Sequence, residues 1–129
     1  VLSGRRCILP MKGWIERGSF VRIDDESIFA VAGLYDAWSL GDGSTMESFC
    51  VVTVEAVADI RRLNNRMPAI LRREDEELWL SRNVRDVERI MSALRPFEGP
   101  LIVELAKPGT PPAQRTLDLG NTGRRRADD

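Results

Sequence analysis

A polar stretch that could do chemistry runs from Asn64 to Pro68, with the sequence NNRMP, between two apolar segments. Pro68 disfavours a helical conformation at Met67, so any preceding helix must end and the chain must turn there. Amide and guanidinium groups held on a turn between packed elements are well placed to bind a ligand. Asparagines in loops also commonly satisfy their own backbone, and the stretch taken alone favours that interpretation.

The chain contains no histidine, the usual general base near neutral pH and a frequent metal ligand. Acid–base chemistry would therefore fall to carboxylates, lysines, cysteines or the terminal amine. Two cysteines, Cys7 and Cys50, lie in apolar, strand-like runs without the spacing of a metal site. We expect both to be buried free thiols, and we expect no metal and no other cofactor.

Arginine dominates the basic residues: 17 of the 19 are arginine, although the net charge is -1. A guanidinium forms bidentate contacts with phosphates and stacks on bases. Codon bias in a GC-rich genome would produce the same excess, and a net charge near zero gives no overall field that attracts nucleic acid. Arginines cluster at Arg5-Arg6, at Arg61-Arg62 with Arg66, and at Arg72-Arg73. Of these, Arg61, Arg62 and Arg66 are the candidate DNA contacts.

The elements that must position these groups are strands followed by short helices. Strand-like apolar runs cover Arg5 to Leu9, Trp14 to Glu16, Ser27 to Trp38, a segment ending at Val54, and Leu101 to Lys107. A short amphipathic helix is expected over about Ala56 to Leu63, immediately before the polar stretch. Helical spacing predicts further helices over Glu74 to Leu80 and after Asn83, which is a good N-cap residue.

The long apolar run from Ser27 to Trp38 predicts a central strand. Gly33 inside it suits a strand that bends or meets another backbone closely. The following Gly41-Asp42-Gly43-Ser44 is typical of a hairpin turn. Tyr35 and Trp38 are assigned to the sheet core, with a stacking face for bases as the alternative.

Several short blocks, in order, resemble motifs of the SOS response-associated peptidase (SRAP) family. They are RRCILP from Arg5, GWIE ending at Glu16, AGL at residues 32–34, and the NNRMP stretch. The corresponding family blocks look like R-C-L-I-P-A-x-G-F-Y-E-W, A-G-L-W and H-x-R-M-P. The resemblance covers about Arg5 to Lys107 and corresponds to the C-terminal part of the family's domain. It implies an SRAP-like domain over residues 1–107, without the family's N-terminal segment, and a disordered tail over residues 108–129.

The fold that we expect is α+β, with antiparallel strands in a partial, bifurcated, barrel-like sheet and two or three short helices. A length of 129 residues with 43% apolar content suits one domain. No signal peptide and no apolar run of roughly 20 residues is present, so a cytoplasmic protein without a membrane partner is expected. Strand edges left open by the missing segment would favour self-association.

The resemblance implies chemistry on abasic sites in single-stranded DNA. In the family, a cysteine exposed after methionine removal forms a thiazolidine with the sugar aldehyde, so the amine and the thiol belong to one residue. Val1 offers an amine without a thiol, and Cys7 offers a thiol without a free amine. Cys7 belongs by resemblance to a strand in which its role is packing.

The remaining site residues match the family in part. By resemblance, Glu16 would shuttle protons beside the aldehyde, and Thr53 and Arg66 would line the site, with Arg66 holding a phosphate or the sugar. Asn64 stands where the family has histidine. Since an amide cannot exchange a proton near neutral pH, general acid–base catalysis from that catalytic position is lost.

Three hypotheses follow. The first is an SRAP-like protein that binds single-stranded or abasic DNA in the DNA-damage (SOS) response without covalent chemistry, with Thr53, Arg61, Arg62 and Arg66 as its DNA contacts. The second is an active peptidase and DNA–protein crosslinking enzyme whose N-terminal cysteine segment is missing from this sequence. The third is a structural remnant that serves protein interactions only. The joint presence of Glu16, Thr53 and Arg66 favours the first.

Overall fold

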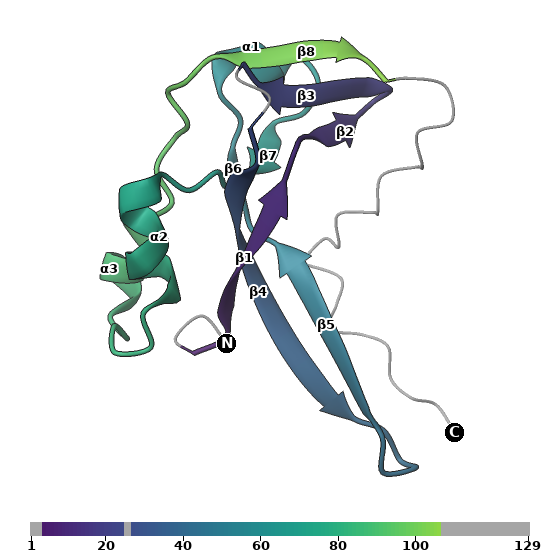
Figure 1. Cartoon of the computed structure of the whole chain (residues 1–129), viewed down its shortest axis with the longest axis vertical. Coiled ribbons are helices and arrows are strands. Elements are labelled where there is room, and N and C mark those ends of the chain that lie inside the picture. The colour runs from purple at the N-terminus through teal and green to yellow at the C-terminus, as the bar shows by residue number, and fades with distance from the viewer. Residues whose placement is uncertain (1–3, 25–26, 107–129) are drawn as a thin grey trace.

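The computed structural model describes residues 4–24 and 27–106, which form eight strands and three helices (Figure 1). In chain order these are β1 (Arg6–Met11), β2 (Trp14–Glu16), β3 (Ser19–Ile23), β4 (Phe29–Ser39), β5 (Thr45–Val51), β6 (Thr53–Glu55), α1 (Ala58–Arg61), β7 (Arg66–Pro68), α2 (Arg73–Leu80), α3 (Val87–Met91) and β8 (Leu101–Leu105). The expected α+β class with antiparallel strands is confirmed, although the sheets do not close into a barrel. The predicted tail over residues 108–129 lies outside the described residues. No helix within the described ranges is long and apolar enough to span a bilayer.

Strand β4 is the centre of the structure, between β1 and β5 in a three-stranded sheet. Its first residues alternate between two hydrophobic cores. Phe29 and Val31 pack into one core with residues of β3, α1 and β7, whereas Ala32 packs into the other with residues of α2 and α3. Because side chains alternate across a strand, the run that begins β4 is apolar at every position.

The backbone of β4 also carries the segments that lead into and out of the polar stretch. Val52 N–H donates to the carbonyl of Ala32, and Ala32 N–H donates to that of Ala69, each over 2.9 Å. Leu71 N–H donates to the carbonyl of Ala30, also over 2.9 Å. The strand expected to end at Val54 is therefore split into β5 and β6 where the chain crosses β4 at Val52.

Gly33 lies on a closely packed face of β4, although not against another backbone as the sequence predicts. A Cβ atom at this position would lie 2.8 Å from Cys7 Sγ and 3.0 Å from Leu9 Cγ. The close neighbours are side chains of β1 rather than another backbone. A side chain here would push β1 out of register with β4.

A second sheet has the strand order β2-β3-β8. Strands β2 and β3 are joined by the two residues Arg17 and Gly18, both with positive φ, at 48° and 76°. This is the conformation that a two-residue hairpin requires. The tight turn fixes the register, so Glu16 pairs with Ser19 at the end of β2.

The far end of β4 and the start of β5 form a hairpin arm that extends beyond both cores (Figure 1). Its turn is the predicted one: the Asp42 carboxylate accepts hydrogen bonds from Ser44, and Gly43 has a φ of 86°. The core assignment of Tyr35 and Trp38 is wrong, since these side chains are 38% and 54% exposed. Strand β4 runs on after the packed layers end, and its later residues have nothing to bury them.

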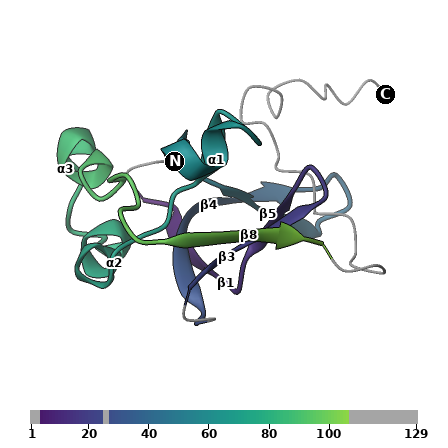
Figure 2. The ribbon, with the colours of Figure 1, turned by 90° about the horizontal axis from the view of Figure 1, so that it is seen from above.

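Helices α2 and α3 lie together on one side of the sheets, apart from α1 (Figures 1 and 2). The buried Arg6 joins them to β1, because its guanidinium donates to the carbonyls of Trp79, Ser81 and Val84. In return, Trp79 Nε1 donates to the carbonyl of Cys7 over 2.8 Å. Strand β1 and the end of α2 are therefore locked together by side chain to backbone hydrogen bonds.

The prediction that Asn83 caps the next helix is wrong. Helix α3 begins at Val87, and the Asp86 carboxylate accepts a hydrogen bond from Glu88 N–H as its N-cap. Arg6 holds the carbonyls of Ser81 and Val84, which keeps the preceding residues in an irregular loop. The shorter helix buries Ile90 and leaves Val87 and Met91 exposed.

We predict that Arg6→Ala destabilises the protein by about 3 kcal/mol, because one buried and two partly buried carbonyls would lose a charged donor. Arg6→Lys should cost less, since an ammonium can restore part of this bonding. Urea denaturation followed by circular dichroism measures both values. Arg73→Ala, at an exposed position of α2, is the control and should change stability by less than about 0.5 kcal/mol. An Arg6→Ala midpoint equal to that of the control would contradict this assignment.

Candidate functional site

The polar stretch lies where the chain returns from α1 into β7. Strand β6 pairs with β7 in the register Thr53↔Pro68, Val54↔Met67 and Glu55↔Arg66. Ala56 N–H donates to the carbonyl of Asn65 over 2.8 Å, which closes the loop at its base. Ile60 of α1 is fully buried and anchors the loop in the core. The loop that carries Asn64 is thereby held at its base by β6–β7 and at its tip by α1.

Helix α1 is shorter than the sequence predicts. It covers Ala58–Arg61, and Val57 before it is extended. After the helix, Leu63 N–H and Asn64 N–H both donate to the carbonyl of Ile60, over 2.8 and 3.0 Å. These two bonds close the last turn through backbone N–H groups. The Asn64 side chain takes no part in them and can bond elsewhere.

Asn64 links two separate parts of the chain. Its Nδ2 donates to Glu16 Oε1 over 3.0 Å, and its Oδ1 accepts from Arg66 N–H over 3.0 Å. The second bond is the local backbone contact expected of a loop asparagine. The first reaches across 48 positions of sequence to the end of β2. The backbone interpretation of Asn64 is therefore confirmed for Oδ1, and its role toward a ligand stays a prediction.

Arg66 continues the chain of hydrogen bonds. Its Nε donates to Thr53 Oγ1 over 3.3 Å, and its Nη2 donates to the carbonyl of Thr53 over 2.8 Å. The residue is exposed, and a guanidinium has five N–H groups. The remaining donors are available to an anion, while the two bonds to Thr53 fix the plane of the group.

Four residues chosen from the sequence thus form one connected set, Glu16–Asn64–Arg66–Thr53, which we call the polar chain. Glu16 Oε2 has no hydrogen bond within residues 4–24 and 27–106. A carboxylate with one oxygen fixed and one open can accept a hydrogen bond or a proton from a bound hydroxyl group. At the other end of the polar chain, the Arg66 guanidinium, which is held on Thr53, supplies positive charge for a phosphate.

Arg61 is the last residue of α1 and Arg62 is its C-cap, three and two residues before Asn64. Both are exposed. Arg61 Nη2 donates weakly to the carbonyl of Ala56, over 3.4 Å, and neither side chain forms an ion pair within the described residues. The two guanidiniums therefore add positive charge near the polar chain without belonging to it.

The cysteines lie away from the polar chain. Cys7 is on β1 opposite Gly33, and Cys50 is on β5 opposite Leu34. Both are free thiols, as expected, but they are half-buried rather than buried. Burial raises the pKa of each thiol, so both stay protonated near neutral pH. This environment suits packing and opposes a role as nucleophile. Within the described ranges no three metal-ligating side chains gather into a site.

The comparisons with known proteins agree on one family. The sequence model described as SOS response associated peptidase (SRAP) matches residues 1–106. The chain is 26% identical over 106 residues to the abasic site processing protein YoqW of Bacillus subtilis, covering 75% of this chain and 47% of that protein. It is also 26% identical over 126 residues to the abasic site processing protein HMCES of Gallus gallus, covering 76% of this chain and 38% of that protein.

Solved structures share the fold. A crystal structure of a protein from Bacteroides thetaiotaomicron superposes with a TM-score of 0.72 at 30% identity, covering 83% of this chain and 51% of that one. A protein from Bordetella bronchiseptica gives a TM-score of 0.66 at 21% identity, covering 80% of this chain and 55% of that one. The chain therefore spans about half the length of the relatives and structures that it matches.

Proposed function

Because the chain belongs to the SOS response-associated peptidase family, we propose that it recognises abasic sites in single-stranded DNA as part of the DNA-damage response. The relatives YoqW and HMCES, both named as abasic site processing proteins, support this substrate class. The observation that carries the proposal is the polar chain, in which hydrogen bonds join the Glu16 carboxylate to the Asn64 amide, this amide to the Arg66 backbone N–H, and the Arg66 guanidinium to Thr53.

Each member of the polar chain has a part in the proposed binding. Arg66 binds the phosphate beside the lesion or the sugar itself, with its plane held by Thr53. Glu16 accepts a hydrogen bond from a sugar hydroxyl through its open oxygen. Asn64 holds both of them in place. Arg61 and Arg62 contact phosphates further along the strand and add affinity without sequence preference.

Asn64 shapes the proposed chemistry as well as the geometry. Its amide keeps the hydrogen bond to Glu16 but cannot act as a general acid or base near neutral pH. Glu16 is the one residue of the polar chain that can transfer a proton there. We therefore propose that these residues bind the lesion without driving covalent capture through position 64.

We also propose the cytoplasm as the location and self-association as the oligomeric behaviour. A DNA partner and two free thiols fit a reducing, DNA-containing compartment. For self-association, β1 and β5 are the edges of their sheet, and the hairpin arm exposes apolar side chains. Trp38, Met46 and Phe49 are each more than half exposed. Open edges beside apolar side chains favour pairing with a second copy.

We predict that the protein binds a fluorescent single-stranded oligonucleotide weakly and that the affinity falls steeply with added salt, because counterions are released from the phosphates. Arg66→Ala should weaken binding to an abasic oligonucleotide about 10-fold, which corresponds to about 1.4 kcal/mol. Fluorescence anisotropy at two salt concentrations measures both effects. Arg89→Ala removes the same charge from an exposed position of α3 and serves as the control. Equal binding by both variants would overturn the role of Arg66.

A second prediction concerns covalent capture. In a polypeptide of these 129 residues, Val1 carries an amine but no thiol. The product of the Val1 amine with the sugar aldehyde is therefore an imine, which hydrolyses. We expect no adduct with abasic single-stranded DNA that survives a denaturing gel, and a trace amount after borohydride reduction. Asn64→His should not change this result, since it restores a proton carrier but no thiol. A heat-stable band without reductant would contradict the account, and peptide mapping would then identify the attached residue.

The third prediction concerns assembly. We expect light scattering at micromolar concentration to show a mass that rises with concentration, because the hairpin arm is apolar and its edges are open. The double variant Trp38→Thr with Phe49→Thr keeps strand-forming residues and removes two exposed rings, so it should shift the protein toward the monomer. A parent protein that stays monomeric at all concentrations and melts cooperatively would exclude self-association.

A further inference from the structure

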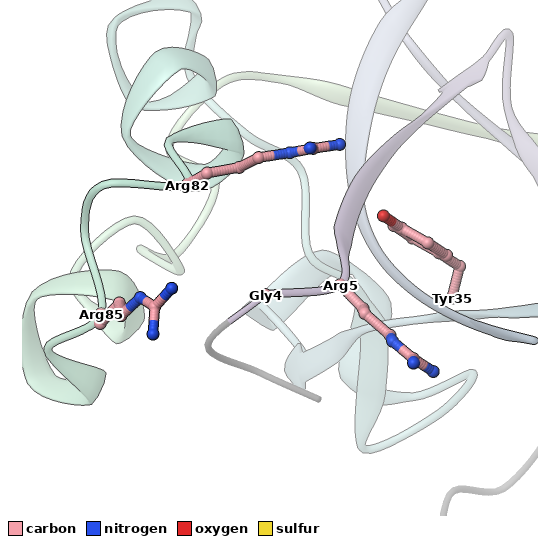
Figure 3. Close-up of a pocket in the computed structure, with 5 residues that line it drawn as sticks. All are labelled: Gly4, Arg5, Tyr35, Arg82 and Arg85. Carbon is pink, nitrogen blue, oxygen red and sulfur yellow. The ribbon is translucent and has the colours of Figure 1, made fainter.

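A second basic region lies at the start of β1, away from the polar chain. It is a hollow of about 350 Å³ lined by Gly4, Arg5, Tyr35, Arg82 and Arg85 (Figure 3). Three guanidiniums and one aromatic ring come from segments that are far apart in sequence. We call this region the arginine hollow. Neither the family motifs in the sequence nor the proposed lesion site includes Arg82 or Arg85.

The backbone around the arginine hollow is firmly held. The buried Arg6 donates to the carbonyls of Ser81 and Val84, on either side of Arg82 and next to Arg85. On the other wall, Tyr35 N–H donates to the carbonyl of Arg5 over 3.0 Å. The loop between α2 and α3 therefore presents its arginines from a fixed position. Fixed backbone lowers the entropy lost when a ligand binds.

The charges in the arginine hollow are only partly balanced. Arg5 forms an ion pair with Asp36, and in Figure 3 its guanidinium points away from the other two arginines. Arg82 and Arg85 are exposed, and neither has a hydrogen bond or ion pair from its side chain within residues 4–24 and 27–106. The neighbouring Asp86 carboxylate is used to cap α3. The hollow thus keeps two unpaired positive charges.

The Tyr35 ring favours a ligand that has an aromatic group as well as a phosphate. Tyr35 is 38% exposed, and Figure 3 shows its ring and the Arg82 guanidinium extending toward each other from two sides of β1. A guanidinium binds a phosphate through paired N–H groups, and an exposed tyrosine offers a face on which a base can stack. Phosphate and base are joined in a nucleic acid, and an acidic peptide has no counterpart of the base.

We propose that the arginine hollow binds the same single strand of DNA at a distance from the lesion, with phosphates on Arg82 and Arg85 and a base on Tyr35. This proposal rests on the function proposed above and adds that the bound DNA strand runs along β1, from the polar chain to the arginine hollow. The six residues of β1 alone rise about 20 Å. A strand must therefore extend several nucleotides past the lesion to reach the arginine hollow, within the roughly 4 to 16 nucleotides that a single-strand site usually covers.

The test compares two abasic oligonucleotides, of about 5 and about 20 nucleotides, by fluorescence anisotropy. The double variant Arg82→Ser with Arg85→Ser should bind the long oligonucleotide about 10-fold more weakly. The slope of its plot of log affinity against log salt concentration should be smaller in magnitude by about 1.4, the value for two phosphate contacts on a single strand. Binding of the short one should stay unchanged. Tyr35→Thr should weaken binding of the long oligonucleotide with little change in its salt dependence.

The matched control is Lys12→Ser with Arg89→Ser, which removes equal charge from exposed positions outside the polar chain and the arginine hollow. If the control and the Arg82/Arg85 variant bind the long oligonucleotide equally, the arginine hollow is not a contact and the proposal fails. If polyglutamate displaces the long oligonucleotide as well as unlabelled DNA does, the hollow binds acidic chains and the proposal also fails. If the Arg82/Arg85 variant loses affinity while Arg66→Ala does not, the hollow stands and the proposed lesion site fails.

Discussion

Burial of β4 on both faces is the constraint on which the rest of the structure depends. Its residues from Phe29 to Ala32 cannot be left exposed on either side, so each face must be covered by another part of the chain. One face receives α1 and the β6–β7 pair, and the other receives α2 and α3. The backbone groups of Ala30 and Ala32 bond to the segments that pass between these layers. The polar chain and the arginine hollow are both positioned by the layers that cover β4.

The polar chain depends on the same packing. Ile60 and Met67 are buried on either side of the loop that carries Asn64, so hydrophobic burial fixes the position of the amide. The hairpin turn at Arg17-Gly18 fixes the register of β2 and so the position of Glu16. The 3.0 Å bond between Glu16 and Asn64 forms where the β2–β3 hairpin meets the loop between β6 and β7. A site assembled in this way is pre-organised, which limits the free energy lost on binding.

Much of this could be predicted from the sequence. The positions of β1, β2, β4 and β8 agree with the expected strands within two residues, since strand periodicity and glycine-containing turns are local signals. Glu16, Asn64, Thr53 and Arg66 were found through family motifs, and the structure brings them together. Their binding and catalytic roles stay predictions.

Other features required the structure. The apolar run from Ser27 to Trp38 places Tyr35 and Trp38 in the core. Its periodicity does not show that β4 extends beyond the layers that cover it. Asn83 looked like an N-cap because nothing local shows that Arg6, far away in sequence, holds the carbonyls around it. Arg82 and Arg85 gave no signal in a chain where arginine is common throughout. Each of these features depends on contacts between distant residues.

The central claim is that the polar chain recognises an abasic sugar, and nuclear magnetic resonance tests it most directly. The Asn64 side-chain amide and the Arg66 Nε–H give separate signals in the ¹⁵N-labelled protein. Titration with abasic single-stranded DNA should shift both signals. The same strand without the lesion should shift the Asn64 signal much less, because the account places Glu16 and Asn64 at the sugar and Arg66 at a phosphate. Equal Asn64 shifts with both strands, or shifts confined to other parts of the protein, would contradict the account.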